Sequence, residues 1–215
     1  MASARIEAIA LAKSFSGRPL FAGVSFALER GVLAIVGPNG SGKTTLVKIL
    51  AGLLTPSGGS VRVEREGRNL SAEERRSAVG WSGPDLAFYP ELTARENLEF
   101  FRKVAGFPTI SEDTRSSLAA VGLAGASGPV EHFSTGMKQR LRIAFALLLE
   151  PDVLLLDEPL SGLDAPGREA VGGLVAAAAK TGPVVLAATD LDELPTPTEV
   201  VELGRRDTGH GTRDT

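Results

Sequence analysis

The sequence predicts an α/β fold in which a mostly parallel sheet is flanked by helices. Residues 153–156 and 184–188 are wholly apolar, which is typical of parallel strands that are covered on both faces. A third apolar stretch, residues 32–36, leads into a glycine-rich loop at 37–44, and a helix is predicted over 45–50. A buried strand, a glycine-rich loop and a helix in this order are the usual setting of a phosphate-binding site.

The loop reads G-P-N-G-S-G-K-T and matches the P-loop pattern G-x-x-x-x-G-K-[ST] at every fixed position. In such loops, successive backbone N–H groups surround the phosphates of ATP, the lysine adds a positive charge, and the last hydroxyl can bind Mg²⁺. We therefore predict a P-loop NTPase fold in which Lys43 is also catalytic and Thr44 is a metal ligand. The predicted nucleotide-binding residues are Gly37, Pro38, Asn39, Gly40, Ser41, Gly42, Lys43, Thr44 and Thr45.

The segments around this unit predict a small antiparallel β subdomain. Strands are expected over 6–11 and 24–28, on either side of a turn at 17–19. A short alternating strand at 61–63 follows a turn at 56–59. The charged segment that comes next, residues 70–79, is predicted to lie on the surface.

A small helical insertion is predicted over about 80–130. It opens with a loop at 81–90 that carries proline and aromatic residues. A capping box at 93–96 begins a helix that ends near Ala105, because glycine and proline follow it. A second helix is expected over 112–121.

The C-terminal part predicts two more helices and three strands. Ser134 caps a helix that runs to Leu149, and an alanine-rich helix covers 168–180. It separates the apolar strands named first, and a last strand is expected at 199–203. We predict one domain over 1–203 and a disordered polar tail over 204–215.

Two adjacent carboxylates follow the apolar strand 153–156. A carboxylate at the C-terminal end of a parallel strand lies where ligands bind in open α/β sheets. After a P-loop, Asp157 is expected to hold Mg²⁺, and Glu158 is expected to polarise the attacking water. The alternative is a solvated acidic turn.

The composition excludes several classes of protein. The chain has 215 residues and no cysteine, and its histidines are His132 and His210. Thiol catalysis and histidine-rich metal sites are therefore excluded. The net charge of −3 argues against a nucleic-acid partner. The N-terminus lacks the pattern of a signal peptide, and no apolar run approaches about 18 residues, so a cytoplasmic protein is expected.

Residues 133–140, F-S-T-G-M-K-Q-R, lie upstream of the acidic pair. Here the chain resembles the ATP-binding cassette (ABC) ATPases, whose signature is typically L-S-G-G-Q followed by a basic residue, Q and R. Ser134, Gly136, Gln139 and Arg140 match this pattern, and the variant is similar to that of some ABC exporters. The resemblance covers about residues 5–203. It also implies that Phe15 stacks on adenine, with core packing as the alternative, and that Asp164 lies in the D-loop at a dimer interface.

The resemblance implies a mechanism. Two ATPase subunits, as a homodimer or a pseudo-dimer, pack head to tail, so that Ser134 and Gly136 of one contact the ATP held by the other. Closing and opening of the pair move a coupling loop, about 81–90, against integral membrane subunits. The ATPase is then expected to be cytoplasmic and peripheral, on the inner face of the membrane. Trp81, Phe88 and Tyr89 are candidate anchors there, and burial of these rings is the open alternative.

Two residues depart from the family pattern. Pro84 stands where the Q-loop glutamine is expected, with Asp85 beside it, and Thr189 stands where the switch histidine is expected. Slow hydrolysis is therefore predicted, with ATP binding retained.

These departures leave two functions open. The first is the ATPase of an ABC exporter, either of the haem-handling type of cytochrome c maturation or one that exports drugs or polysaccharides. The second is a regulatory ATP-binding module with little turnover. A GTP-binding switch is excluded, because no asparagine precedes lysine as in N-K-x-D.

Overall fold

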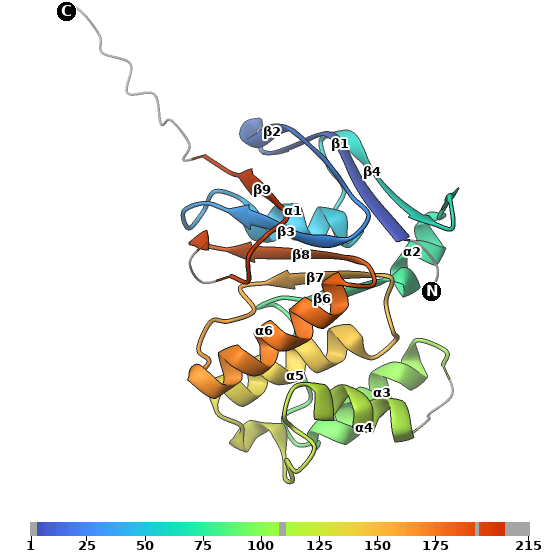
Figure 1. Ribbon diagram of the computed structural model, residues 1–215, viewed down its shortest axis with the longest axis vertical. Coiled ribbons are helices and arrows are strands. Elements are labelled where there is room, and N and C mark those ends of the chain that lie inside the picture. Colours follow the sequence, from blue (N-terminus) through green and yellow to red (C-terminus); the bar gives the residue numbers. More distant parts are fainter. Residues whose placement is uncertain (1–3, 108–110, 192–193, 205–215) are drawn as a thin grey trace, which may run out of the picture.

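The computed structural model describes residues 4–107, 111–191 and 194–204. A five-stranded sheet lies at its centre, with the strand order β6-β7-β8-β3-β9 and parallel pairing throughout (Figure 1). Its strands are β3 (Gly31–Val36), β6 (Val79–Ser82), β7 (Val153–Asp157), β8 (Pro183–Ala188) and β9 (Glu199–Glu202). The predicted parallel sheet is confirmed.

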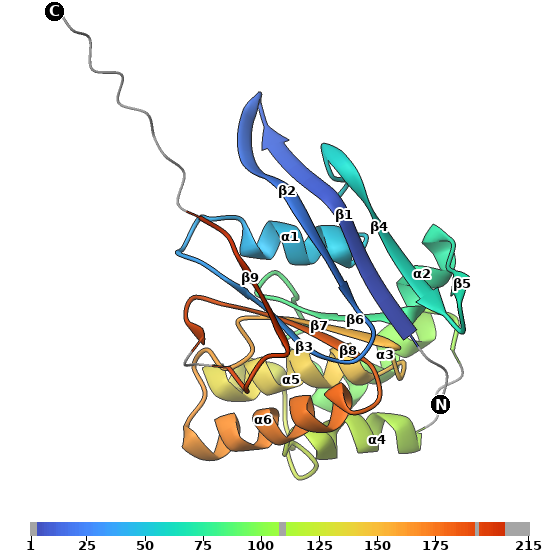
Figure 2. The same cartoon turned by 45° about the horizontal axis from the view of Figure 1, so that its top comes forward.

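A second, antiparallel sheet has the order β2-β1-β4-β5. It consists of β1 (Ala4–Phe15), β2 (Arg18–Leu28), β4 (Gly58–Arg65) and β5 (Arg68–Asn69). Helix α1 (Lys43–Leu50) lies between the two sheets (Figure 2). Leu46, Val47, Ile49 and Leu50 of this helix are almost completely buried, so the P-loop helix is fixed from both sides.

The other face of the parallel sheet is covered by α5 (Thr135–Leu147) and α6 (Ala165–Ala179) (Figure 1). Helices α3 (Ala94–Val104) and α4 (Ser111–Ala120) pack outside α5, and a short 3₁₀ turn, η1 (Val130–His132), precedes it. Along β7, Leu155 joins the core on the α1 side, whereas Leu154 and Leu156 join the core on the α5 and α6 side. This two-sided burial explains why the strand is continuously apolar.

Three local predictions were wrong. The first turn lies at Ser16 and Gly17, both with positive φ, and Pro19 belongs to β2, an edge strand that tolerates proline. Gly58 and Gly59 begin β4 rather than ending a turn. Trp81 lies in β6, a strand of the central sheet, and not in a loop.

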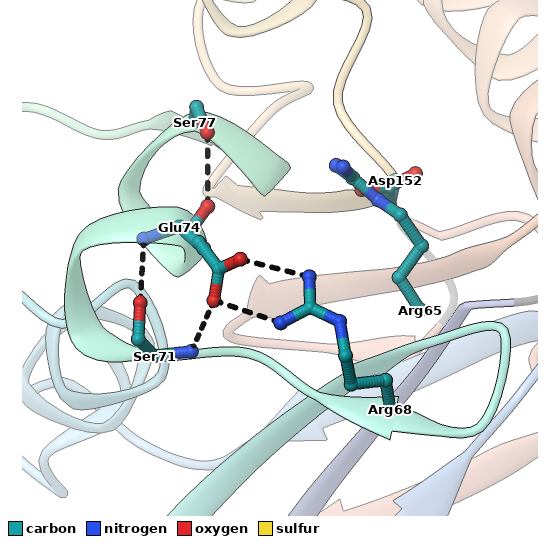
Figure 3. A network of polar contacts seen from close by, with 6 residues as sticks. All are labelled: Arg65, Arg68, Ser71, Glu74, Ser77 and Asp152. Carbon is teal, nitrogen blue, oxygen red and sulfur yellow. Dashed lines mark hydrogen bonds and ion pairs between the residues drawn. The ribbon is translucent and has the colours of Figure 1, made fainter.

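The charged segment after β5 contains a helix, α2 (Ala72–Ala78), that the sequence analysis missed. Its N-terminus has a capping box formed by Ser71 and Glu74, and Glu74 also binds the Arg68 guanidinium (Figure 3). These contacts hold the pKa of Glu74 at about 2, with the Arg68 hydrogen bond as the largest cause. Nearby, Arg65 on β4 pairs with Asp152, just before β7, and so ties the two sheets together.

In the described residues, none of the helices has the length and apolar character needed to span a bilayer. The predicted helices at 94–105 and 112–121 are confirmed as α3 and α4. The predicted disordered tail lies outside the described residues, apart from Gly204. The division into one domain with a helical insertion stays a prediction, and β6 sets the start of that insertion after Ser82.

Candidate nucleotide-binding site

The P-loop connects β3 to α1 in a conformation that its glycines permit. Gly37 has φ 155°, and a Cβ atom there would lie 2.4 Å from the Leu203 carbonyl oxygen. Gly42 has φ 105° and is the N-cap residue of α1. It has no side chain to bond the first N–H groups of the helix. Those donors and the helix dipole are therefore suited to an anion.

A cavity of about 400 Å³ opens beside this loop. Phe15 reaches it from the end of β1, and its ring is 49% exposed. The Lys13 ammonium lies 4.9 Å from the ring centroid. The residues around the cavity are Phe15, Leu20, Asn39, Gly40, Gly42, Lys43, Thr44, Thr45 and Glu158. The structure therefore brings together three predicted parts of the site: the Phe15 ring expected to stack on adenine, the P-loop, and Glu158, the expected base.

Lys43 lies at the centre of the site. Its side chain is 6% exposed, and Nζ donates to the Gly37 carbonyl oxygen at 2.7 Å. The same ammonium lies 3.6 Å from Glu158 Oε1. Lys43 thus connects the predicted phosphate-binding loop to the Glu158 carboxylate, which is expected to polarise the attacking water.

Glu158 follows β7 in the left-handed region, with φ 50°. A residue other than glycine rarely takes this conformation, and surrounding contacts must hold it there. Its N–H donates to the Ala187 carbonyl at 2.8 Å, and its own carbonyl accepts from Gln139 Nε2 at 3.0 Å. The Thr189 hydroxyl lies 3.2 Å from Glu158 Oε1 and 3.4 Å from Asn39 Oδ1. With a single proton, Thr189 donates to one of them at a time.

Asp157 and Thr44 fit a magnesium ion. Asp157 is 1% exposed, and its carboxylate oxygens make no hydrogen bond of normal geometry among the described residues, although the Thr44 hydroxyl is close enough to stabilise the charged form. Burial is the main cause that raises the pKa of Asp157, and Thr44, Lys43 and Lys48 oppose the rise. The described residues contain no cluster of three histidine or acidic side chains suited to a metal. One carboxylate and one hydroxyl suffice for Mg²⁺, because nucleotide phosphates and water supply its other ligands.

The signature and D-loop residues lie apart from this cavity. Ser134 is exposed and accepts the Met137 N–H at 3.2 Å as the N-cap of α5. Asp164 caps α6 by accepting the Gly167 N–H at 3.0 Å. A Cβ atom on Gly136 would lie 3.1 Å from the Gly162 carbonyl oxygen, so the two segments pack together. None of Ser134, Gly136 and Asp164 lines the cavity.

The segment around Pro84, where the family has the Q-loop glutamine, contacts the P-loop helix and not the cavity. Asp85, beside Pro84, forms an ion pair with Lys48 on α1 and does not line the cavity. The contacts of Lys48, Gln139 and Arg142 were not predicted from the sequence. Gln139 stands in the signature segment, but no local pattern identifies the partners of these three residues, because each contact joins segments that are far apart in the chain.

Comparison with known proteins agrees with this geometry. The family model described as "ABC transporter" matches residues 21–161. The chain therefore belongs to the ABC transporter family and is an ATP-binding subunit with ATPase activity. The family match and the relatives described below give no support to the alternative of a module with little turnover.

Individual relatives are similar over most of the chain. The cytochrome c biogenesis ATP-binding export protein CcmA of Nitrobacter winogradskyi is 39% identical over 175 residues, which cover 80% of this chain and 85% of the relative. The protein of the same name from Bradyrhizobium diazoefficiens is 37% identical, with 81% and 86% covered. The linearmycin resistance ATP-binding protein LnrL of Bacillus subtilis is 32% identical, with 84% of this chain and 60% of the relative covered.

Solved structures share the fold. A bacterial Atm1-family ABC exporter with ATP bound superposes with a TM-score of 0.78 at 22% identity, over 94% of this chain and 37% of that one. The dimeric structure of MJ0796, a bacterial ABC transporter cassette, gives a TM-score of 0.77 at 23% identity, over 93% of this chain and 94% of that one.

Proposed function

We propose that the cavity beside the P-loop binds Mg-ATP and that Glu158 polarises the water that attacks the γ-phosphate. The backbone of residues 37–44 and the Lys43 ammonium hold the phosphates, and Phe15 stacks on the adenine. Thr44 and Asp157 hold the magnesium ion, which neutralises charge that develops on the phosphates. ATP and water then give ADP and phosphate.

The position of Glu158 carries this proposal. Its carboxylate lies 3.6 Å from Lys43 Nζ, although the two residues are 115 positions apart in the sequence. The left-handed backbone and the bonds from Thr189 and Gln139 hold it at the edge of the cavity. This is the place from which a base can reach a water aligned with the γ-phosphate.

Glu158→Gln tests the proposed base. The variant keeps a side chain of the same size and every P-loop contact except the charge. Phosphate release should fall at least a hundredfold, within the range of about 10²–10⁴ that a positioned acid or base contributes, while fluorescent ATP still binds. Glu112→Gln, an exposed change on α4, is the control and should keep the full rate. A Glu158→Gln chain that hydrolyses ATP normally would refute the role of Glu158.

A second copy of the chain completes the proposed site. Ser134 and Gly136 lie at the N-terminus of α5, a second anion-binding helix end that does not face the cavity of its own chain. Head-to-tail pairing would place this end against the γ-phosphate held by the partner, with Asp164 at the contact. ATP then holds the two chains together, and its hydrolysis releases them.

We further propose that the surface around α3 docks a cytoplasmic segment of a membrane-spanning partner. Tyr89, Phe100, Val104 and Phe107 form more than half of the large apolar residues that are exposed in the described part of the chain. The Tyr89 and Phe100 ring centroids lie 5.0 Å apart. A neighbouring cavity of about 280 Å³, lined mainly by apolar residues of β6, α3 and α5, continues this surface.

Of the candidate anchors, Tyr89 is exposed, Trp81 lines the cavity, and Phe88 packs edge-on against Phe101 and Phe145. Phe88 is therefore half-buried against the core rather than fully exposed. Phe100→Ser should release the chain from membranes of cells that also produce the membrane subunits, without lowering the ATPase rate of the isolated chain. Val200→Ser, at an exposed position on β9, is the control. Equal membrane association of both variants would contradict the docking surface.

The relatives suggest export in cytochrome c biogenesis as the process that this ATPase drives, with haem handling as the specific role. The chain would then work on the inner face of the membrane, and no nucleic acid is expected to bind. Resistance to a drug is the second candidate, favoured by the match to the linearmycin resistance protein. Deletion of the gene should abolish covalently bound haem in c-type cytochromes. Normal cytochromes together with increased drug sensitivity would favour the second candidate.

A further inference from the structure

Gln139, the only glutamine of the chain, connects helix α5 to the backbone of Glu158. Its side chain is 7% exposed, and Nε2 donates to the Glu158 carbonyl oxygen at 3.0 Å. The same carbonyl accepts the Ser161 N–H at 3.2 Å. The left-handed backbone at Glu158 is thus fixed by contacts on its carbonyl side as well as by its N–H bond to β8.

Arg142 continues the connection away from the site. One turn further along α5, its Nη1 donates to Gln139 Oε1 at 3.1 Å, and its Nε donates to the Leu86 carbonyl at 3.2 Å. A guanidinium can only donate and a carbonyl can only accept, so the orientation of the Gln139 amide is determined by its two neighbours. The chain of bonds runs from Leu86 through Arg142 and Gln139 to Glu158.

Leu86 lies in the loop between β6 and α3, and this loop is held on two sides. Its neighbour Asp85 pairs with Lys48 on the P-loop helix. A few residues further on, Tyr89 belongs to the exposed aromatic surface. A shift of this loop would therefore displace two sets of contacts. One is the ion pair of Asp85 with α1, and the other is the chain of hydrogen bonds from Arg142 through Gln139 to the backbone of Glu158.

We infer that Gln139 and Arg142 are positioning residues for hydrolysis: they hold the backbone of Glu158 so that its carboxylate faces the P-loop, and they link that backbone to the loop at 83–90. In this chain the side chain of Pro84 cannot supply a hydrogen bond from that loop, and the Arg142–Gln139 pair forms a connection from the loop to the base. The inference rests on the proposed role of Glu158.

Two variants of the full chain test it. Gln139→Glu has the same shape and keeps the oxygen that Arg142 binds, but it loses the donor to Glu158. Arg142→Met keeps the length of the stem and loses both donated bonds. Each should lower kcat for Mg-ATP about fivefold, the effect of one neutral hydrogen bond. KM and the dissociation constant of fluorescent ATP should stay within about twofold, because the P-loop contacts are unchanged.

The double variant separates a series connection from independent effects. If Arg142 acts through Gln139, Gln139→Met combined with Arg142→Met should be no slower than Gln139→Met alone, whereas independent effects would multiply. Methionine replaces Gln139 in this pair because a carboxylate at that buried position would lose its partner when Arg142 is removed. Arg75→Met is the matched control, because Arg75 also donates to a backbone carbonyl, that of Val61, but lies between α2 and β4. It should keep its kcat.

Several results would overturn the inference. They are an unchanged kcat in both single variants, a loss of kcat in Arg75→Met as large as in Arg142→Met, a loss of ATP affinity as large as the loss of kcat, or a multiplicative double variant. If Gln139→Glu does not fold, Arg142→Met alone decides by its kcat and KM. Full hydrolysis by Glu158→Gln would refute the proposed base itself. An inactive Glu158→Gln with unaffected Gln139 and Arg142 variants would refute only the positioning role.

Discussion

At the scale of single residues, the contacts of the site converge on Lys43 and Glu158. Lys43 is almost completely buried, and its ammonium contacts both the Gly37 carbonyl oxygen of the P-loop and the Glu158 carboxylate. The Thr189 hydroxyl is a neutral donor to that carboxylate. Binding and hydrolysis therefore depend on different atoms and can be separated by substitution.

Lys43→Ala should weaken ATP binding roughly 10- to 150-fold. The change removes a charge-assisted contact to phosphate, which is worth about 1.5–3 kcal/mol. Titration with fluorescent ATP measures the effect, and Lys180→Ala, at the end of α6, is the control. Unchanged affinity in Lys43→Ala would show that ATP binds elsewhere.

Thr189→Val should lower kcat about fivefold and leave ATP affinity nearly unchanged. Valine has the shape of threonine but cannot donate to Glu158 Oε1, and a neutral hydrogen bond contributes about 1 kcal/mol. Thr181→Val removes a comparable hydroxyl bond, to the Ala178 carbonyl, far from the site and should keep the rate. A Thr189→Val chain as fast as the control would mean that Thr189 does not support the base.

The P-loop residues were predictable because glycine, lysine and threonine at fixed spacing determine the backbone and its chemistry locally. The acidic pair was predictable because it follows a wholly apolar strand. The contacts of Gln139, Arg142 and Thr189 with their partners were not predictable. They depend on how α5, β7 and β8 pack, which no short pattern in the sequence records.

At the scale of elements, α2 and β6 show where local sequence signals are weak. Helix α2 is a single short run of charged and small residues without an apolar periodicity, so the capping signal Ser71 to Glu74 was its one marker. Strand β6 has four residues and contains Gly80, where a Cβ atom would lie 2.0 Å from the Ala146 carbonyl oxygen. Only glycine fits at this close contact with α5. Because glycine has a low strand propensity, the sequence does not predict the strand.

Ser71→Ala should lower the free energy of unfolding by about 1 kcal/mol, the usual cost of losing an N-cap. The hydroxyl accepts the Glu74 N–H, and alanine leaves that donor without its partner. Ser77→Ala, in the same helix, is the control and should be nearly neutral, since alanine favours helix. Urea unfolding measures both, and equal losses would contradict the role of the cap.

Glu74 should make stability depend on pH below its ordinary range. Its pKa falls from 4.5 to about 2 on folding, so its stabilising effect is complete above pH 4.5 and is lost as the pH drops from there toward 2. Glu74→Gln should therefore be less stable than the unchanged chain at about pH 7, with the difference shrinking by about pH 3. Urea midpoints at the two pH values test this. A difference of the same size at both would contradict it.

At the scale of the whole molecule, the two halves of the proposed ATP site lie on different surfaces of one chain. The P-loop, Phe15 and Glu158 line one cavity, whereas Ser134 and Gly136 at the start of α5 do not reach it. We therefore propose that ATP binds between two copies, with the P-loop of one opposite Ser134 of the other.

The most direct measurement is the molar mass of Glu158→Gln in Mg-ATP, determined by light scattering after size exclusion. Blocked hydrolysis should leave ATP bound, and the chain should be a dimer with Mg-ATP and a monomer with Mg-ADP. Adding Ser134→Arg should restore the monomer while fluorescent ATP still binds. A Glu158→Gln chain that binds ATP as a monomer, or a dimer that Ser134→Arg does not disturb, would contradict the head-to-tail site.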